Sequence, residues 1–135
     1  MITVLLADDH AMVRDGLRYI LEAAGDIRIV ALASNGKEAV ALAFTDCPNI
    51  AVIDISMPVM DGIEATRQIL EVCPKTRIVT LSMYHTEEYV LRALHAGAFG
   101  YVLKDAAGSE LVDAVRSLHA GKRYFSPQVA KYYAE

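Results

Sequence analysis

Apolar and polar positions follow two different periods along this chain. Five short runs are almost wholly apolar and rich in β-branched residues, as is typical of strands buried on both faces: ITVLLA (2–7), IRIVALA (27–33), IAVID (50–54), RIVTLS (77–82) and FGYVL (99–103). The intervening segments carry apolar residues at helical spacing. The first of them has its apolar face from Val13 to Ala24 and ends at Gly25. The pattern predicts five strands that alternate with five helices.

Strict alternation of strands and helices predicts right-handed crossovers and a parallel sheet with helices on both faces. Five strands favour an α/β, flavodoxin-like fold with the strand order 2-1-3-4-5. Asn35 with Glu38, and Asp61 with Glu64, are capping pairs that predict two helix starts. Ser109 is predicted to open the fifth helix. In this strand order a ligand binds where the order reverses, between the carboxyl ends of the first and third strands.

Three carboxylates stand at that point. Asp8 and Asp9 close the first strand, and Asp54 closes the third. Three converging carboxylates repel one another, so they need a cation, and Mg²⁺ accepts a few carboxylates while keeping positions for water and phosphate oxygens. We expect Asp9 and Asp54 to bind Mg²⁺ directly, Asp8 to bind it through water, and the backbone carbonyl of Ser56 to add an oxygen. Mn²⁺ is the expected substitute.

The other strand ends supply groups that complement these acids. Ser82 closes the fourth strand with a hydroxyl, and Lys104 follows the fifth with an ammonium. A metal, a nucleophilic carboxylate, a hydroxyl and a cation together suit in-line phosphoryl transfer to an aspartate. Ser56, Met57 and Tyr84 are expected to flank this pocket.

Composition limits the function classes. The 135 residues fit one domain, and 54% hydrophobic with 22% charged residues excludes a disordered chain. A formal charge of −4 argues against nucleic-acid binding by these residues. No apolar run reaches the roughly 18 residues of a membrane span, and no targeting signal is evident, so we expect a cytoplasmic protein. Cys47 and Cys73 lack metal-ligand spacing and are expected to be ordinary thiols. His10 is expected to start a helix rather than to act as a ligand.

Several motifs carry a family resemblance. "LLADDH", "VIDISMPVMDG", "IVTLS" and "GYVLKD" occur in order, and together they resemble the receiver domain of two-component response regulators, which has the CheY-like fold. The match covers residues 1–121. "MDGIEATRQI", "AGAFGYVLKDA" and the tail pattern G-x-x-Y-x-SP are similar, more narrowly, to NarL/FixJ (LuxR-type) regulators. Residues 122–135 then resemble a linker and the start of a sixth helix, opened by Ser126, that leads to an absent C-terminal helix-turn-helix domain.

The resemblance implies a role for each candidate residue. Asp54 is the implied phosphoacceptor, the two adjacent acids hold magnesium, and Lys104 binds the phosphoryl group with Ser82. Ser82 and Tyr101 are the implied switch pair. Many receivers have a proline with a cis bond after this lysine, whereas Asp105 follows Lys104 here, so the cis and trans forms both remain open.

The resemblance also implies partners. They are a sensor histidine kinase, a phosphorylation-dependent second copy of the chain, and DNA, the last only through the C-terminal domain. The implied output surface is formed by the fourth helix, the fifth strand and the fifth helix. The alternatives are a stand-alone receiver that acts through protein contacts, an interaction module that lost phosphorylation, and a flavodoxin-like FMN protein. The acidic first loop disfavours the FMN protein, because its carboxylates repel phosphate.

Overall fold

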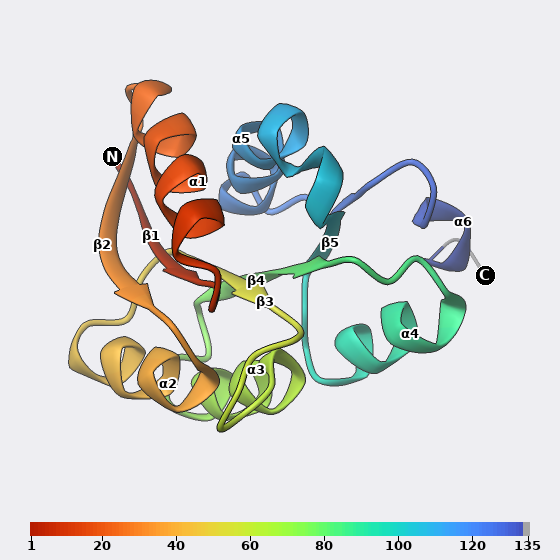
Figure 1. The fold of residues 1–135 in the computed structure, drawn as a ribbon, viewed down its shortest axis with the longest axis horizontal. Helices are drawn as coiled ribbons and strands as arrows, with labels where there is room; N and C mark the ends of the chain where they lie inside the picture. Colours follow the sequence, from red (N-terminus) through yellow and green to blue (C-terminus); the bar gives the residue numbers. More distant parts are fainter. Residues whose placement is uncertain (134–135) are drawn as a thin grey trace.

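Strands and helices alternate along the whole chain in the computed structural model, which describes residues 1–133 (Figure 1). The strands are β1 (Ile2–Ala7), β2 (Ile27–Ala33), β3 (Ile50–Asp54), β4 (Arg77–Ser82), β5 (Gly100–Leu103) and β6 (Tyr124–Phe125). The helices are α1 (Ala11–Ala23), α2 (Gly36–Thr45), α3 (Gly62–Val72), α4 (Glu87–His95), α5 (Ala107–His119) and α6 (Ala130–Tyr133), with a 3-10 turn, η1 (Lys104–Ala106), before α5.

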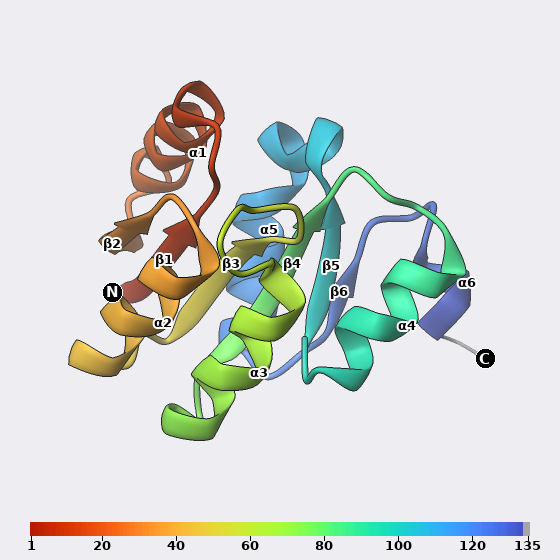
Figure 2. The same ribbon diagram turned by 60° about the horizontal axis from the view of Figure 1, so that its bottom comes forward.

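The sheet is parallel and lies between two layers of helices. Its strand order is β2-β1-β3-β4-β5-β6. Helices α1 and α5 cover one face, and α2, α3 and α4 cover the other (Figures 1 and 2). Each face has its own apolar core, which is why the central strands carry apolar residues on both faces rather than at alternate positions. The predicted fold and the reversal of strand order between β1 and β3 are confirmed.

The prediction of five strands is wrong by one. The two-residue strand β6 pairs with the outer edge of β5, Gly100 opposite Tyr124 and Tyr101 opposite Phe125. Two residues are too few to show a strand period in the sequence, so the pairing depends on the chain returning beside β5 after α5.

Ser126 holds this tail in place, and its carbonyl also opens the turn that leads into α6, because it accepts hydrogen bonds of 3.0 and 3.1 Å from the amides of Val129 and Ala130. Its backbone amide donates to the carbonyl of Tyr101, and its hydroxyl accepts a hydrogen bond of 2.9 Å from the amide of Leu103. The same hydroxyl donates to Glu110 in α5 over 2.6 Å. The regular helix α6 runs from Ala130 to Tyr133, so the predicted opening at Ser126 lies one turn before it. Residues 134 and 135, the end of the predicted linker, lie outside the described residues.

Helices α2 and α3 begin where the capping pairs predict, whereas α5 begins earlier than predicted. The side chains of Asn35 and Asp61 accept hydrogen bonds of 2.8 and 2.9 Å from the amides of Glu38 and Glu64, as predicted. Helix α5 begins at Ala107 rather than at Ser109, because the turn η1 leads into it without a break. The hydroxyl of Ser109 donates to the carbonyl of Ala106.

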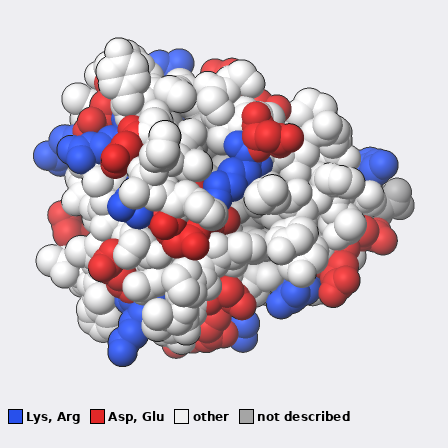
Figure 3. All heavy atoms as spheres, in the orientation of Figure 1, with Lys and Arg blue, Asp and Glu red and all other residues white. Residues whose placement is uncertain are grey.

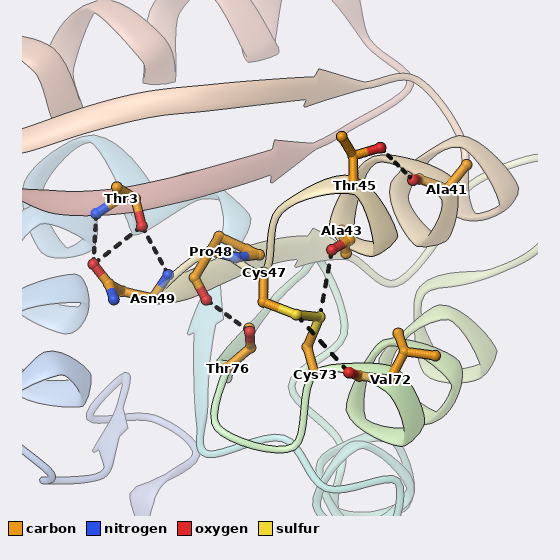
Figure 4. Close-up of a disulfide and its surroundings, with 10 residues drawn as sticks. All are labelled: Thr3, Ala41, Ala43, Thr45, Cys47, Pro48, Asn49, Val72, Cys73 and Thr76. Atoms are coloured by element: carbon orange, nitrogen blue, oxygen red, sulfur yellow. Dashed lines mark hydrogen bonds between the residues drawn. A yellow bond between two sulfur atoms is a disulfide. The ribbon is translucent and has the colours of Figure 1, made fainter.

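The prediction that Cys47 and Cys73 are free thiols is wrong, because they form a disulfide (Figure 4). Cys47 precedes β3 and Cys73 precedes β4, and these two strands are neighbours in the sheet. The amino ends of neighbouring parallel strands lie side by side, so the loops that lead into them meet. Their Cα atoms are 5.6 Å apart, which is within the usual range for a disulfide.

Charged side chains of both signs are mixed over the face seen in Figure 3, where lysine and arginine lie among aspartate and glutamate. On this face, the described residues form no continuous basic stripe of the kind that binds a nucleic-acid backbone. Among residues 1–133, no helix combines the length and the apolar character that crossing a bilayer requires.

Candidate functional site: an acidic pocket at the carboxyl edge of the sheet

The strand order brings the three predicted acids together. β1 and β3 are neighbours, with Ala7 opposite Ile53, so the residues that follow them share one edge of the sheet. Asp8 and Asp54 are almost fully buried, with exposed fractions of 0% and 1%, and the side chain of Asp9 is partly open. Ligand atoms of these acids and of His10 all lie within 4.8 Å of one another. The predicted convergence is confirmed.

Lys104 reaches into this cluster from the end of β5. Its Nζ lies 2.9 Å from Oδ2 of Asp54 and 3.2 Å from Oδ2 of Asp8. Burial alone lowers the pKa of Lys104, but its hydrogen bond to Asp54 and the charges of both carboxylates outweigh burial, so the pKa is raised. The ammonium therefore stays charged. The bond between Lys104 and Asp105 is trans, as is every peptide bond in the described part of the chain.

Burial makes Asp54 a poor site for a negative charge. It raises the pKa of the Asp54 carboxyl, and the nearby charge of Asp8 raises it further, whereas the hydrogen bond from Lys104 only partly offsets them. Oδ1 of Asp54 accepts a hydrogen bond of 3.2 Å from the amide of Ser56. Asp54 thus has a defined orientation, with one oxygen held by the backbone and the other by the lysine.

The donor set fits a hard divalent cation. Oδ1 of Asp8 accepts a hydrogen bond from the amide of His10, whereas Oδ2 is buried without any hydrogen-bond partner. The ammonium of Lys104 lies near Oδ2 of Asp8 but is not aligned for a hydrogen bond. A buried carboxylate oxygen is costly unless something binds it, and oxygen atoms are the ligands that Mg²⁺ prefers. The acid cluster can therefore hold a metal ion.

His10 belongs to the pocket, which the sequence interpretation missed. It does stand at the start of α1, but its side chain makes no capping hydrogen bond. Its Nδ1 lies 3.2 Å from Asp9, 3.3 Å from Asp8 and 3.1 Å from Nζ of Lys104. An Nδ1 that carries a hydrogen can donate a hydrogen bond to the carboxylates. An Nδ1 without a hydrogen can accept one from the ammonium of Lys104 instead. The signal was the position of His10 directly after two candidate ligands.

Ser82, at the end of β4, and Tyr101, in β5, both form hydrogen bonds to the backbone of Tyr84 in the loop between β4 and α4. The hydroxyl of Ser82 accepts a hydrogen bond of 2.9 Å from the amide of Tyr84. The phenol of Tyr101 is fully buried and donates to the carbonyl of the same residue, Tyr84, over 2.6 Å. Burial raises the pKa of Tyr101. The two candidate switch residues are thus linked through the backbone of Tyr84.

The predicted flanking residues line a hollow near the end of β3. Ser56, Met57 and Tyr84 border a hollow of about 320 Å³ between the β3–α3 loop and α4. Met57 packs against the core, and the ring of Tyr84 stacks on Tyr89 with their centroids 4.1 Å apart. Of these three residues, Ser56 contacts Asp54 through its amide, and the role of Met57 and Tyr84 beside the acidic pocket stays a prediction.

Glycine at the start of α3 lets the helix approach the site. The amide of Gly62 donates to the carbonyl of Ile55 over 2.9 Å. A side-chain methyl at Gly62 would overlap the backbone carbonyl of Asp54. The close packing of α3 against β3 therefore depends on the absence of a side chain there.

The family model for the response regulator receiver domain matches residues 4–116. The chain belongs to the response regulator receiver family. This receiver domain is a two-component signalling module, and its relatives are of the LuxR/NarL type. It is 42% identical to the uncharacterized transcriptional regulatory protein YxjL of Bacillus subtilis, over 92% of this chain and 57% of that protein. It is 40% identical to the response regulator UvrY of Escherichia coli, over 99% of this chain and 62% of that protein.

A solved structure agrees with the fold of the receiver domain. A two-component response regulator of the LuxR family from Aurantimonas superposes with a TM-score of 0.93 at 37% identity, covering 99% of this chain and 96% of that one. The receiver domain spans 57% and 62% of the lengths of the two curated relatives above. Those proteins therefore contain more than the part that resembles this chain.

Proposed function

We propose that this receiver domain accepts a phosphoryl group on Asp54 from a sensor histidine kinase, in a reaction that needs Mg²⁺. The observation that carries the proposal is the setting of Asp54. It is buried at the point where the strand order reverses, Lys104 binds one of its oxygens over 2.9 Å, and Asp8, with a buried oxygen lacking a hydrogen-bond partner, lies beside it.

The residues divide the work of phosphoryl transfer. An Asp54 oxygen forms a bond to phosphorus while the bond between phosphorus and the donor, a phosphohistidine nitrogen or a small phosphodonor, breaks. Lys104 moves from the free carboxylate to an oxygen of the transferred group, and its positive charge offsets the negative charge of that group. Asp8, Asp9, Asp54 and the carbonyl of Ser56 would hold Mg²⁺, or Mn²⁺ in its place, which supplies further charge neutralisation. The same site would release the group by hydrolysis.

The hydroxyl of Ser82 is the reporter of phosphorylation. It is bound to the amide of Tyr84 and must leave that amide to reach a phosphoryl oxygen. Tyr101 is bound to the carbonyl of the same residue, so a shift of this loop changes its packing as well. The outcome is a population shift of the surface formed by α4, β5 and α5.

The relatives support a proposal for the output of the whole protein. Two of them are named as a transcriptional regulatory protein and a response regulator, and each is longer than this chain. We propose that residues 1–121 are the receiver and that the tail leads to a helix-turn-helix domain that binds DNA in the cytoplasm. Phosphorylation would control this domain through dimerisation of the receiver.

Intact-mass analysis tests the proposal. The receiver domain is incubated with acetyl phosphate and Mg²⁺, with EDTA in a parallel sample. We expect one phosphoryl adduct that needs the metal, is removed by hydroxylamine and is absent from Asp54→Asn. Asp113→Asn, which removes an exposed carboxylate on α5, is the matched control and should be phosphorylated normally. An adduct that persists in Asp54→Asn would place the nucleophile elsewhere.

A further inference from the structure

The Cys47–Cys73 disulfide lies at the amino edge of the sheet, opposite the acidic pocket. It joins the loop after α2 to the residue that ends α3, across a sequence separation of 26 residues (Figure 4). None of the proposed phosphoryl chemistry uses these cysteines. Disulfides in cytoplasmic proteins are mostly redox-active rather than structural, so the pair calls for a chemical explanation.

The two cysteine residues differ in exposure. Cys73 is 2% exposed and packs in the core beneath α2 and α3, whereas Cys47 is an exposed residue. Both border an open cleft of about 590 Å³, which Pro48, Pro74 and Lys75 also line. A small thiol can therefore approach through the cleft and reach the sulfur of Cys47. The ammonium of Lys75 complements a thiol that carries carboxylates.

The dithiol form also fits the fold. Sγ of Cys73 lies 3.4 Å from the carbonyl of Ala43, and Sγ of Cys47 lies 3.9 Å from the carbonyl of Val72. These carbonyls are in the last turns of α2 and α3, where helices leave acceptors without partners. The disulfide has no S–H to donate, but after reduction each thiol has an acceptor within reach.

The surrounding loops have contacts that do not depend on the sulfur bond. The hydroxyl of Thr76 donates to the carbonyl of Pro48 over 2.6 Å. Thr3 and Asn49 exchange two hydrogen bonds of 2.9 Å, from the amide of each residue to the side chain of the other (Figure 4). The loop can thus keep its place when the disulfide opens.

We propose that Cys47 and Cys73 are a reversible redox modification site that exchanges with glutathione. A glutathione thiolate attacks Sγ of Cys47, which forms a mixed disulfide and releases Cys73 as a thiolate that takes up a proton. A second glutathione thiolate attacks the glutathione sulfur of this mixed disulfide and releases Cys47, which also takes up a proton. The protein disulfide is reduced to two thiols, and two glutathione molecules are oxidised to glutathione disulfide.

Helices α2 and α3 connect the disulfide to the β3–α3 loop of the acidic pocket. Figures 1 and 2 show these helices side by side, and the disulfide ties their carboxyl ends. Their amino ends hold the β3–α3 loop, since Gly36 donates to the carbonyl of Met60 over 3.0 Å and Gly62 donates to that of Ile55 over 2.9 Å. Opening the disulfide removes the covalent tie at one end of this pair, so the two helices can shift slightly against each other and loosen the β3–α3 loop, while the hydrogen bonds of Thr76 and Asn49 keep the loop before β3 in place.

A redox titration tests the site on the unmodified protein. The chain is equilibrated in glutathione buffers with an increasing ratio of oxidised to reduced glutathione. Free thiols are then alkylated and counted by intact-mass analysis. We expect a reversible change from two alkylated thiols to none, with a folded circular dichroism spectrum at both ends and faster amide exchange of residues 55–62 in the dithiol form. Two free thiols in the most oxidising buffer, or reduction only in denaturant, would overturn the site. Unchanged amide exchange would overturn its coupling to the pocket.

A matched pair of variants tests the order of attack. Cys73→Ser keeps the accessible Cys47, and Cys47→Ser keeps the buried Cys73. With glutathione disulfide, Cys47→Ser should gain a glutathione about tenfold more slowly than Cys73→Ser or not at all, because access limits thiol exchange. Equal rates would contradict the assignment of Cys47 as the attacked sulfur. Neither readout depends on phosphorylation of Asp54, so the two proposals fail separately.

Discussion

The ammonium of Lys104 lies 2.9 Å from Oδ2 of Asp54 and joins the end of β5 to the end of β3. It also lies 3.2 Å from the buried carboxylate of Asp8. One lysine thus offsets two buried carboxylates, which leaves the pocket negative. That imbalance links the stability of the receiver domain to the binding of a cation and, in the proposed reaction, frees the lysine for a phosphoryl oxygen.

Replacing Lys104 with methionine should destabilise the metal-free domain. The change leaves buried carboxylates without their cation, and breaking such a pair costs about 3 kcal/mol. Urea unfolding in EDTA measures this loss in the free energy of unfolding, and added Mg²⁺ should restore part of it. Lys37→Met, at an exposed position on α2, should change stability by less than about 0.5 kcal/mol. Equal unfolding midpoints for the two variants would show that the contact is not stabilising.

The charge on Asp54 should make stability depend on pH. Because burial raises the pKa of Asp54 above 3.8, the folded state binds its proton more tightly than the unfolded chain does. The stability that this proton contributes is present below pH 3.8 and is lost as the pH rises through the raised pKa of the folded state. In EDTA, Asp54→Asn should therefore be more stable than the parent at pH 7, by a margin that narrows on acidification. Thermal unfolding across pH measures this, and a less stable variant at pH 7 would contradict it.

His10 should affect which metal ion the pocket prefers. Its imidazole lies among the acids, and imidazole is a better ligand for Ni²⁺ than for Mg²⁺. We expect His10→Ala to weaken Ni²⁺ binding about tenfold in calorimetry and to leave Mg²⁺ binding nearly unchanged. His119→Ala, at the opposite edge of the sheet, is the control. A loss of the same size for both ions would mean that His10 acts on the charge of the pocket and not as a ligand.

Two glycine-to-alanine changes should have opposite effects on stability. Gly62→Ala puts a methyl against the carbonyl of Asp54 and should cost about 2–3 kcal/mol, as overpacking does. Gly16→Ala adds a methyl in open space on α1 and should stabilise by about 0.5–1 kcal/mol, because alanine favours helix. Urea unfolding measures both. Equal midpoints would contradict the close approach of α3 to β3.

Ser126 should hold the tail to the body of the domain. Ser126→Ala leaves the buried amide of Leu103 without its acceptor, which costs about 1–3 kcal/mol. Hydrogen exchange at the Leu103 amide should accelerate together with the loss of stability. Ser109→Ala, at an exposed site on α5, serves as the control and should change neither quantity appreciably. An unchanged Leu103 amide would show that other contacts hold the tail.

Most residues of the pocket could be predicted because they lie at the carboxyl ends of strands. Asp8, Asp9 and Asp54 follow apolar runs, and in a parallel sheet the carboxyl ends of all strands share one edge. Lys104 follows from the same rule. His10 was missed because a residue at a helix start has no fixed side-chain direction in the sequence, and the acids turn it towards the pocket.

The apolar pattern by itself determined the alternating elements, the parallel sheet and the edge at which the acids meet, because these depend on local periodicity and on the handedness of crossovers. Only the tertiary structure decided contacts between segments far apart in the chain. Cys47 and Cys73 pair because the loops before β3 and β4 meet, and Tyr124 joins the sheet because the chain returns beside β5. Neither the disulfide nor the pairing of β6 with β5 can be recognised from a local sequence pattern, because each depends on the packing of the whole domain.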